Sequence, residues 1–275
     1  MAATHAVVCL PSLDVRRRPD HRSEMTSQFL MGEIVRLAGR ERGGWVPAEG
    51  EADGYRGWVR SWGLVPATRS RAGRWRRLAR ARVNVAWTEV RATPRGASLV
   101  SPLPWNARVI AGRARRGWRA VELPDGRRGV VPAAALAGPN QAPPGLIERV
   151  RGLLGVTYLW GGRTPAGFDC SGFTQQLYAE RGVALPRDAS DQFRSCRALA
   201  GGEAEREGDL VFFRAAGRRV GHVGVVLGGG YFAHVRGRVR IASLERSNPL
   251  WDMELARQFA GFGRPPVRPL RGARR

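Results

Sequence analysis

A glycine-rich segment runs into an amphipathic helix at Cys170, and this junction constrains the fold more than any other part of the sequence. The large apolar residues that follow are Phe173, Leu177 and Tyr178, at the spacing of a helix with one buried stripe. Asp169 is placed to cap the start of this helix. The unpaired amides of the first turn and the helix dipole would then favour the thiolate form of Cys170. The sequence therefore predicts a nucleophilic cysteine.

Two histidines lie downstream, in a segment that reads as a β-hairpin over residues 220–235. Three glycines at 228–230 supply its turn. If all three form the loop, His234 faces Gly224 and lies diagonally from His222 on the same face of the hairpin. A two-residue turn would reverse this parity. The small Gly224 leaves room for the His234 ring, so we expect one histidine to act as a base while the other fixes its tautomer.

Four motifs in this order resemble those of the NlpC/P60 family of cysteine peptidases. They are Asp169-Cys170-Ser171-Gly172-Phe173, Gly208-Asp209-Leu210-Val211-Phe212-Phe213, His222-Val223-Gly224 and His234. The resemblance covers residues 145–263. It implies an α+β, papain-like fold, in which the helix of the nucleophile packs on an antiparallel sheet that carries both histidines. It also implies hydrolysis of bacterial cell-wall peptides, commonly at the bond between γ-D-glutamyl and a diamino acid.

The catalytic residues that this resemblance indicates are Cys170 as nucleophile, His222 as proton shuttle and His234 as the residue that orients His222. The backbone amide of Cys170 and the hydroxyl of Tyr158 are the candidates for stabilising the oxyanion. We expect no metal, because the histidines are spaced like a hairpin pair and no carboxylate cluster joins them. No other cofactor is expected either.

The remaining cysteines, Cys9 and Cys196, are expected to be free thiols. Cys9 lies in an apolar run, and Cys196 follows a polar helix-like segment with no histidine near it in the sequence. Three cysteines in 275 residues make no disulfide framework.

The first 140 residues show short apolar runs, tryptophans and glycine-bearing turns with little helical periodicity, which favours small all-β domains. A faint internal repeat relates residues 32–59 to residues 107–131, so a duplicated barrel is expected. Both copies resemble bacterial SH3-like domains. A linker over residues 136–145 and a helix over residues 146–154 would follow. The expected domains are SH3-like barrels at 1–66 and 75–137, the catalytic domain at 145–263 and a disordered basic tail at 264–275.

A second resemblance concerns the loop over residues 185–192. It resembles the loop of cytoplasmic γ-D-glutamyl–diamino acid endopeptidases, which release an N-terminal L-Ala-D-Glu dipeptide. In those enzymes an acidic residue of this loop and residues of the first SH3-like domain close the pocket around the free amine. The candidate substrate-binding residues are therefore Asp188, with Arg187 and Ser190 beside it, Asp169 and Ser171 next to the nucleophile, and Glu24 and Tyr55 from the first barrel.

Three of these candidates have structural alternatives. Tyr55 can be a half-buried barrel aromatic, Glu24 a solvated turn residue, and Asp188 a helix cap. In physical terms, a buried carboxylate is a good counter-charge for an ammonium group and a poor neighbour for a blocked amide.

The formal net charge of +23 would ordinarily suggest a polyanionic partner. All 46 basic residues are arginine, however, which points to compositional bias rather than to a nucleic-acid surface. No basic helix with an aromatic platform is visible, and the arginine runs at 16–18 and 74–77 are expected beside turns. We therefore expect no nucleic-acid partner.

The first residues show no basic leader and no long apolar stretch, so neither a secretory signal nor a membrane segment is visible and we expect a cytoplasmic protein. The expected substrate is a murein peptide, L-Ala-γ-D-Glu-diamino acid, with a free amine. The alternatives are a secreted DL-endopeptidase acting on intact wall, a non-catalytic wall-fragment binding protein, and an acyltransferase on a related fold. The preferred diamino acid and the oligomeric state do not follow from the sequence.

Overall fold

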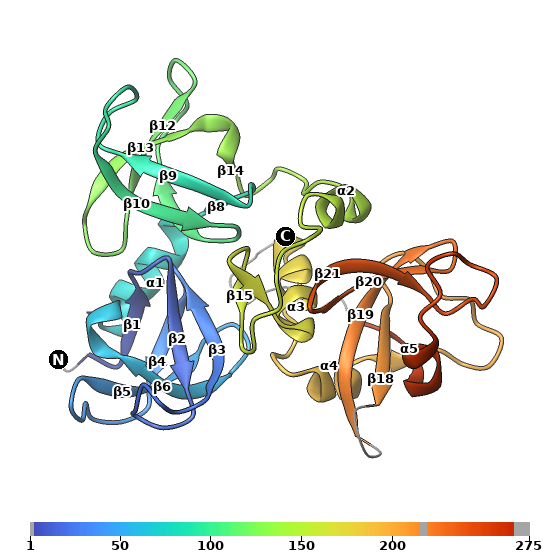
Figure 1. The fold of residues 1–275 in the computed structure, drawn as a ribbon. Coiled ribbons are helices and arrows are strands. Elements are labelled where there is room, and N and C mark those ends of the chain that lie inside the picture. The colour runs from blue at the N-terminus through green and yellow to red at the C-terminus, as the bar shows by residue number, and fades with distance from the viewer. Residues whose placement is uncertain (1–2, 215–218, 267–275) are drawn as a thin grey trace. The chain divides into compact units, whose positions relative to one another are not determined.

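The computed structural model describes residues 3–214 and 219–266 and separates into two compact units, which meet in the sequence between Pro143 and Pro144 (Figure 1). The first unit is almost entirely β, and the second combines helices with an antiparallel sheet. The expected α+β fold class is confirmed.

The first unit begins with a sheet whose strands order as β3-β2-β6-β5-β4-β1-β7. Its core is formed by buried aliphatic residues and by Phe29. The elements are β1 (His5–Val8), β2 (Ser12–Arg16), β3 (Met25–Leu30), β4 (Ile34–Leu37), β5 (Trp45–Gly50), β6 (Arg56–Arg60), the 3-10 turn η1 (Ser61–Gly63) and β7 (Leu64–Ala67).

A second sheet repeats this strand order as β10-β9-β13-β12-β11-β8-β14, which agrees with the repeat detected in the sequence. Its elements are β8 (Ala81–Val83), β9 (Trp87–Arg91), β10 (Leu99–Pro104), β11 (Arg108–Ala111), β12 (Trp118–Glu122), β13 (Arg128–Pro132), η2 (Ala133–Ala135) and β14 (Leu136–Ala137). The expected linker therefore starts after Ala137, because residues 136 and 137 close this sheet.

A helix joins the two sheets, where the sequence predicted turns. Helix α1 (Arg69–Leu78) is capped by Thr68, whose hydroxyl accepts from the Arg71 amide, and it contains the arginine run at 74–77. Its Trp75 is buried and donates from Nε1 to the Gly32 carbonyl. Met31, from the first sheet, lies in the core of the second. Both sheets thus belong to one compact unit.

The second unit is built on an antiparallel sheet with the strand order β17-β22-β18-β19-β20-β21. Helix α3 packs on β19 and β20, and α4 on β19 (Figure 1). The strands are β17 (Arg197–Ala198), β18 (Leu210–Arg214), β19 (Val220–Gly228), β20 (Tyr231–Arg236), β21 (Arg238–Ser243) and β22 (Phe259–Arg264), with a separate pair β15 (Arg163–Thr164) and β16 (Gly167–Phe168). The helices are α2 (Leu146–Arg151), α3 (Cys170–Glu180), α4 (Ala189–Ser195) and α5 (Met253–Gln258).

Two boundaries differ from the sequence expectation. Helix α2 ends at Arg151 rather than at residue 154, and Gly152 is its C-cap. Arg264, expected to open the tail, is the last residue of β22 and binds both carboxylate oxygens of the buried Asp209 at 2.8 and 2.7 Å. This ion pair holds the end of β22 in the sheet. Residues 267–275 of the expected tail lie outside the described residues.

Candidate active site

Helix α3 starts at Cys170 because Asp169 caps it, as the sequence predicted. The Asp169 Oδ1 accepts from the Gly172 amide at 2.6 Å, and its Oδ2 accepts from the Gly161 amide at 2.9 Å. One buried carboxylate thus joins the start of the helix to the glycine-rich loop that precedes it. This bond pattern holds Cys170 at the first position of the helix.

Close backbone packing explains the glycines around the nucleophile. A Cβ at Gly172 would lie 2.2 Å from the Gly162 carbonyl oxygen, and a Cβ at Gly162 would lie 2.3 Å from the Gly167 oxygen. No larger residue fits at either position without moving the backbone. The loop and the helix start therefore form one packed unit around Cys170.

Arg187 and Ser171, both expected to bind substrate, lie in the buried network beneath this helix start. The Arg187 guanidinium donates to the two Asp169 carboxylate oxygens at 3.0 and 2.5 Å, and to the Ser171 hydroxyl at 2.9 Å. All three residues are buried. Asp169 and Ser171 therefore have internal partners, and Arg187 acts as the counter-charge of Asp169. Contacts of these three residues with substrate stay a prediction.

The Cys170 thiol is buried against the strand that carries His222. Its sulfur interacts with the backbone N–H groups of Val223, the residue after His222, and of Ser171. Pairing of β19 with β20 begins at the next residue, Gly224. The thiol therefore lies where the β19–β20 pairing begins, at the amide of the residue that follows His222 in the chain.

Burial, followed by the charge of Asp169, raises the pKa of Cys170 to about 12. The sequence led us to expect the opposite direction, from the amides of the helix start. The Val223 and Ser171 N–H groups do lower this pKa, but the loss of solvation is the larger effect. In the free protein the thiol is thus neutral and needs a base to take its proton.

The two histidines lie in the predicted register. Gly224 pairs with His234, and a Cβ at Gly224 would lie 3.2 Å from the His234 Cβ and 2.8 Å from the Ala233 carbonyl oxygen. The pairing reaches this register in an unexpected way: Gly228 pairs with Tyr231, and a bulge lies between Val226 and Gly228. The turn therefore has two residues, and the bulge restores the parity that such a turn would otherwise reverse.

The imidazoles of His222 and His234 bind each other directly. The His222 Nε2 lies 2.9 Å from the His234 Nδ1. His234 is fully buried, whereas His222 is partly exposed. The direct contact between the two rings was expected; the roles of His222 as base and of His234 as the residue that orients it stay predictions.

A further residue, Arg240 of β21, completes the line of side chains. Arg240 pairs with His234 across the β20–β21 ladder and donates from Nε to the His234 Nε2 at 3.1 Å. It also donates from Nη2 to Asp252 at 2.7 Å, and Asp252 caps helix α5. The sequence analysis missed this residue. A turn centred on Gly237 would have placed Arg240 opposite His234.

The Arg240 bond decides where the histidine protons lie. A guanidinium only donates, so the His234 Nε2 is an acceptor and His234 carries its proton on Nδ1. His234 then donates to the His222 Nε2, and a neutral His222 carries its own proton on Nδ1.

Both histidines are neutral at pH 7. Burial, followed by the charges of Arg236 and Arg240, lowers the pKa of His222 to about 4. Burial, the neighbouring His222 and the same two arginines lower the pKa of His234 to about 2. Asp252 opposes the effect on His222 without cancelling it.

Tyr158 lies within electrostatic reach of Cys170, and its support of the oxyanion stays a prediction. Its side chain is 38% exposed, and burial together with the charges of Cys170 and Asp169 raises its pKa to about 12. The hydroxyl therefore keeps its proton and can donate a hydrogen bond at any physiological pH.

The other predicted substrate residues lie in two different units. Asp188 is exposed at the N-cap position of α4, where its side chain makes no cap hydrogen bond, and Ser190 lies in the first turn of the same helix. Glu24 and Tyr55 belong to the first unit, where Glu24 pairs with Arg17 at 2.7 Å and Tyr55 packs on the barrel core. The part of these residues in substrate binding stays a prediction.

The remaining cysteines are free thiols, as predicted: Cys9 is buried and Cys196 is partly buried. Over residues 3–214 and 219–266, no group of three or more His, Cys, Asp or Glu side chains could hold a metal ion. Within the same ranges, no helix is long and apolar enough to cross a membrane.

Two family models match separate segments of the chain. Residues 155–258 match the NlpC/P60 family, and residues 15–64 match the bacterial dipeptidyl-peptidase SH3 domain. The first match contains Cys170, His222 and His234, and the second contains Glu24 and Tyr55.

Two curated relatives and one solved structure illustrate the similarity. The chain is 37% identical over 120 residues to a probable endopeptidase p60 of Listeria seeligeri, which covers 43% of this chain and 21% of that protein. It is 38% identical over 98 residues to a γ-D-glutamyl-L-lysine dipeptidyl-peptidase of Bacillus cereus, and this match covers 35% of this chain and 29% of that protein. The match thus spans less than a third of either relative. The crystal structure of an NlpC/P60 family protein from Bacillus cereus superposes with a TM-score of 0.79 at 22% identity, over 96% of this chain and all of that one, which shows a shared fold.

Proposed function

We propose that this chain, which carries an NlpC/P60 cysteine peptidase domain at residues 155–258, hydrolyses the γ-D-glutamyl–diamino acid bond of murein peptides. The observation that carries the proposal is the contact of the Cys170 sulfur with the amide of Val223, the residue that follows His222, whose ring is joined to His234 at 2.9 Å. A buried thiol and a neutral imidazole next to it are the parts that acyl transfer to cysteine needs. The B. cereus relative, named a γ-D-glutamyl-L-lysine dipeptidyl-peptidase, supports this bond as the target.

In the proposed reaction the Cys170 sulfur attacks the γ-carbonyl carbon of the D-glutamyl residue, and the thiol proton passes to His222. The oxyanion accepts hydrogen bonds from the Cys170 amide and the Tyr158 hydroxyl. His222 then gives the proton to the leaving amine as the C–N bond breaks. Water attacks the resulting thioester and gives a proton to His222. The C–S bond then breaks, His222 returns that proton to the Cys170 sulfur, and the dipeptide acid leaves.

Proton transfer in this scheme requires one rearrangement. The His222 Nε2 is bound to His234, so Nδ1 is the nitrogen left for the thiol. In the arrangement described, Nδ1 carries a proton. The protons must therefore shift to His222 Nε2 and His234 Nε2 before His222 can act as a base, which breaks the Arg240–His234 bond.

The proposal extends to a free N-terminal amine and to recycling of imported peptides in the cytoplasm. The requirement for a free amine is supported by the exposed carboxylate of Asp188. This residue is at the N-cap position of helix α4, which contacts β19. The match of residues 15–64 to the dipeptidyl-peptidase SH3 domain favours the same reading.

The direct test is incubation with L-Ala-γ-D-Glu-L-Lys and L-Ala-γ-D-Glu-meso-diaminopimelate, followed by mass spectrometry. Release of L-Ala-D-Glu by the wild type, and not by Cys170→Ala, is expected. Absence of cleavage of both peptides by a folded enzyme would overturn the proposal.

A second candidate function is hydrolysis of intact wall. A bifunctional muramidase/DL-endopeptidase of Bacillus subtilis, to which this chain is 43% identical over 79 residues, favours it; the match covers 28% of this chain and 24% of that protein. Solubilisation of purified sacculi at a rate comparable to cleavage of the free peptide would establish this function instead.

A further inference from the structure

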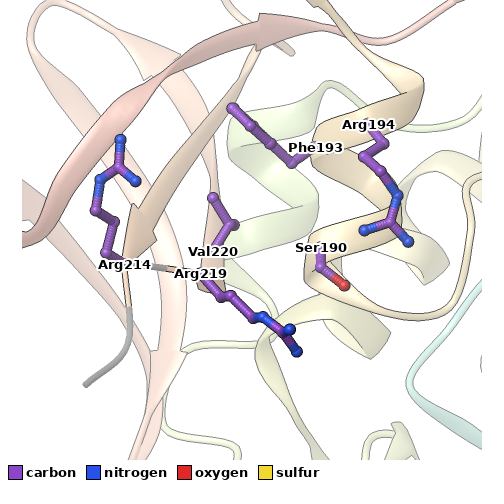
Figure 2. A pocket seen from close by; sticks show the side chains of 6 residues that line it. All are labelled: Ser190, Phe193, Arg194, Arg214, Arg219 and Val220. Atoms are coloured by element: carbon purple, nitrogen blue, oxygen red, sulfur yellow. The ribbon is translucent and has the colours of Figure 1, made fainter. Parts of the chain in front are cut away.

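An arginine-lined pocket of about 620 Å³ lies in the second unit, between helix α4 and the adjoining ends of β18 and β19 (Figure 2). We call it the arginine pocket; its lining residues are Ser190, Phe193 and Arg194 of α4, Arg214 of β18, Arg219, and Val220 of β19. Figure 2 shows the Arg194 and Arg219 guanidinium groups on the Ser190 side of the pocket and Arg214 on the opposite side. Three positive charges therefore surround one hollow.

The sheet register explains why the pocket forms at this place. Arg214 pairs with Val220, whereas Phe213 pairs with His222, so Gly221 is an extra residue in β19. Alternation along β18 places Arg214 on the face of the sheet that carries Phe212, and the bulge turns Val220 to the same face. Helix α4 packs on that face through Phe193, whose ring lies 5.1 Å from the Phe212 ring.

The pocket is connected to the start of α3 through helix α4. The Gln192 side chain of α4 donates to the carbonyl of Ser171, the residue after Cys170, at 3.0 Å. Val220 lies two residues before His222, about 7 Å along β19, and the bulge turns its side chain to the face opposite to His222. On the other side, Ser190 follows the segment whose Arg187 binds Asp169, the residue before the nucleophile. A peptide bound across Cys170 would therefore have parts of its chain near this pocket.

The lining chemistry favours a carboxylate. Guanidinium groups stay charged at all relevant pH values and match a carboxylate with two parallel N–H donors. Arg194 forms an ion pair with Asp191, which lies outside the lining, and the Arg194 side chain is 70% exposed. None of the described lining residues is acidic, and Phe193 with Val220 supplies an apolar surface.

We propose that the arginine pocket binds a carboxylate of the peptide substrate and so determines which murein peptides are cleaved. The inference rests on the proposed function. Two substrate groups have the required chemistry: the α-carboxylate of the γ-linked D-glutamate, and the second carboxylate of a leaving diaminopimelate, which lysine lacks. The first would select against D-isoglutamine peptides, and the second would select diaminopimelate over lysine.

Four peptides distinguish these sources: L-Ala-γ-D-Glu and L-Ala-D-isoglutamine, each followed by L-Lys or by meso-diaminopimelate. The wild-type kcat/KM should fall roughly 10- to 100-fold when the bound carboxylate is absent, the range for loss of a charged hydrogen-bonding partner. Arg214→Gln/Arg219→Gln should reduce cleavage of the preferred peptides by a similar factor and leave the poor peptides nearly unchanged. The ratio of kcat/KM between preferred and poor peptides should therefore approach one in the double variant.

The control is Arg257→Gln, an exposed arginine on α5 outside the pocket, which should leave all four rates unchanged. Equal loss on all four peptides in the double variant, or no loss on any, would overturn the pocket assignment. If the wild type cleaves none of the four, the proposed function fails. Calorimetric titration with L-Ala-γ-D-Glu and with meso-diaminopimelate then tests the pocket: binding of one of them that the double variant weakens roughly 10-fold supports it, and absent or unchanged binding overturns it.

Discussion

Arg240 donates from Nε to the Nε2 of His234 across 3.1 Å, and so places the His234 proton on the nitrogen that faces His222. Asp252 holds the guanidinium from behind at 2.7 Å. The pair of histidines is thereby held in the tautomer that keeps a proton on the His222 Nδ1. This nitrogen is the one that must accept the thiol proton in the proposed reaction.

Replacing Arg240 should change the tautomer of both histidines. In the wild type, nitrogen-15 NMR of the side chains should show protons on His234 Nδ1 and His222 Nδ1. In Arg240→Met, the His234 Nε2 is free to take a proton, and His222 should shift its proton to Nε2. Arg236→Met is the matched control, because it removes a nearby charge without a bond to either ring. A wild-type spectrum with a proton on His234 Nε2 would contradict the assignment.

Loss of the nucleophile should abolish hydrolysis. Cys170→Ala is expected to reduce kcat by roughly 1000-fold or more, because removal of a nucleophile leaves only binding and oxyanion stabilisation. Cys196→Ala, in the same unit, should stay within a factor of a few of the wild type. Steady-state kinetics with matched thermal unfolding curves check both, and residual Cys170→Ala activity above about 1% would contradict the assignment.

The two histidines should differ in their effect on rate. His222→Ala is expected to be as damaging as Cys170→Ala, because no other group accepts the thiol proton in the proposed reaction. His234→Asn should keep partial activity, because an amide can still bind the His222 ring. The opposite order of kcat values would exchange the two roles.

The pH dependence should follow the lowered pKa of His222. Because that pKa lies near 4, the acid limb of kcat/KM should fall below pH 5, where an ordinary histidine would place it near pH 6.5. The groups that act on the His222 ring are the His234 and Phe213 rings and the charges of Arg236, Arg240 and Asp252. An acid limb centred above pH 6 would show that the ring is charged more readily than its burial implies.

Stability should change over the same window. Both histidines bind protons more weakly in the folded than in the unfolded state, so the unfolded state gains protons first as the pH falls. The free energy of unfolding is therefore highest above pH 6.5 and should decrease as the pH falls towards 4. Urea unfolding at pH 7 and pH 5 measures this decrease in the free energy of unfolding. The decrease should be smaller in the double variant His222→Ala/His234→Ala, which lacks both titrating groups.

Asp188 should control the preference for a free amine. If its carboxylate binds the substrate ammonium group, N-acetylation of L-Ala should reduce kcat/KM by roughly 30- to 150-fold, the effect of losing one partner of a charged contact. Asp188→Asn should narrow this ratio by slowing cleavage of the free-amine peptide. Glu148→Gln, an exposed acid on α2, serves as the control. Equal rates on free and acetylated peptides would show that this end of the site is open.

Local patterns in the sequence were enough to predict the helix that starts at Cys170 and its cap. The cap at Asp169, the glycines that allow close backbone packing and the pairing of Gly224 with His234 all depend on residues near one another in the chain. The correct register also depended on a bulge near Gly228 that the sequence did not reveal. The two-residue turn and this bulge were both unpredicted, and their effects on the strand register cancel each other.

The tertiary structure alone decided the electrostatics of the site. Burial raises the pKa of Cys170 where its helix position predicted the opposite, because desolvation depends on what the rest of the chain packs around the sulfur. Likewise Arg187 faces Asp169 from a different loop, and Arg240 reaches His234 only across a strand pair. Chemistry carried by one segment can be read from the order of its residues. Solvation and partners from distant segments exist only once the chain has folded.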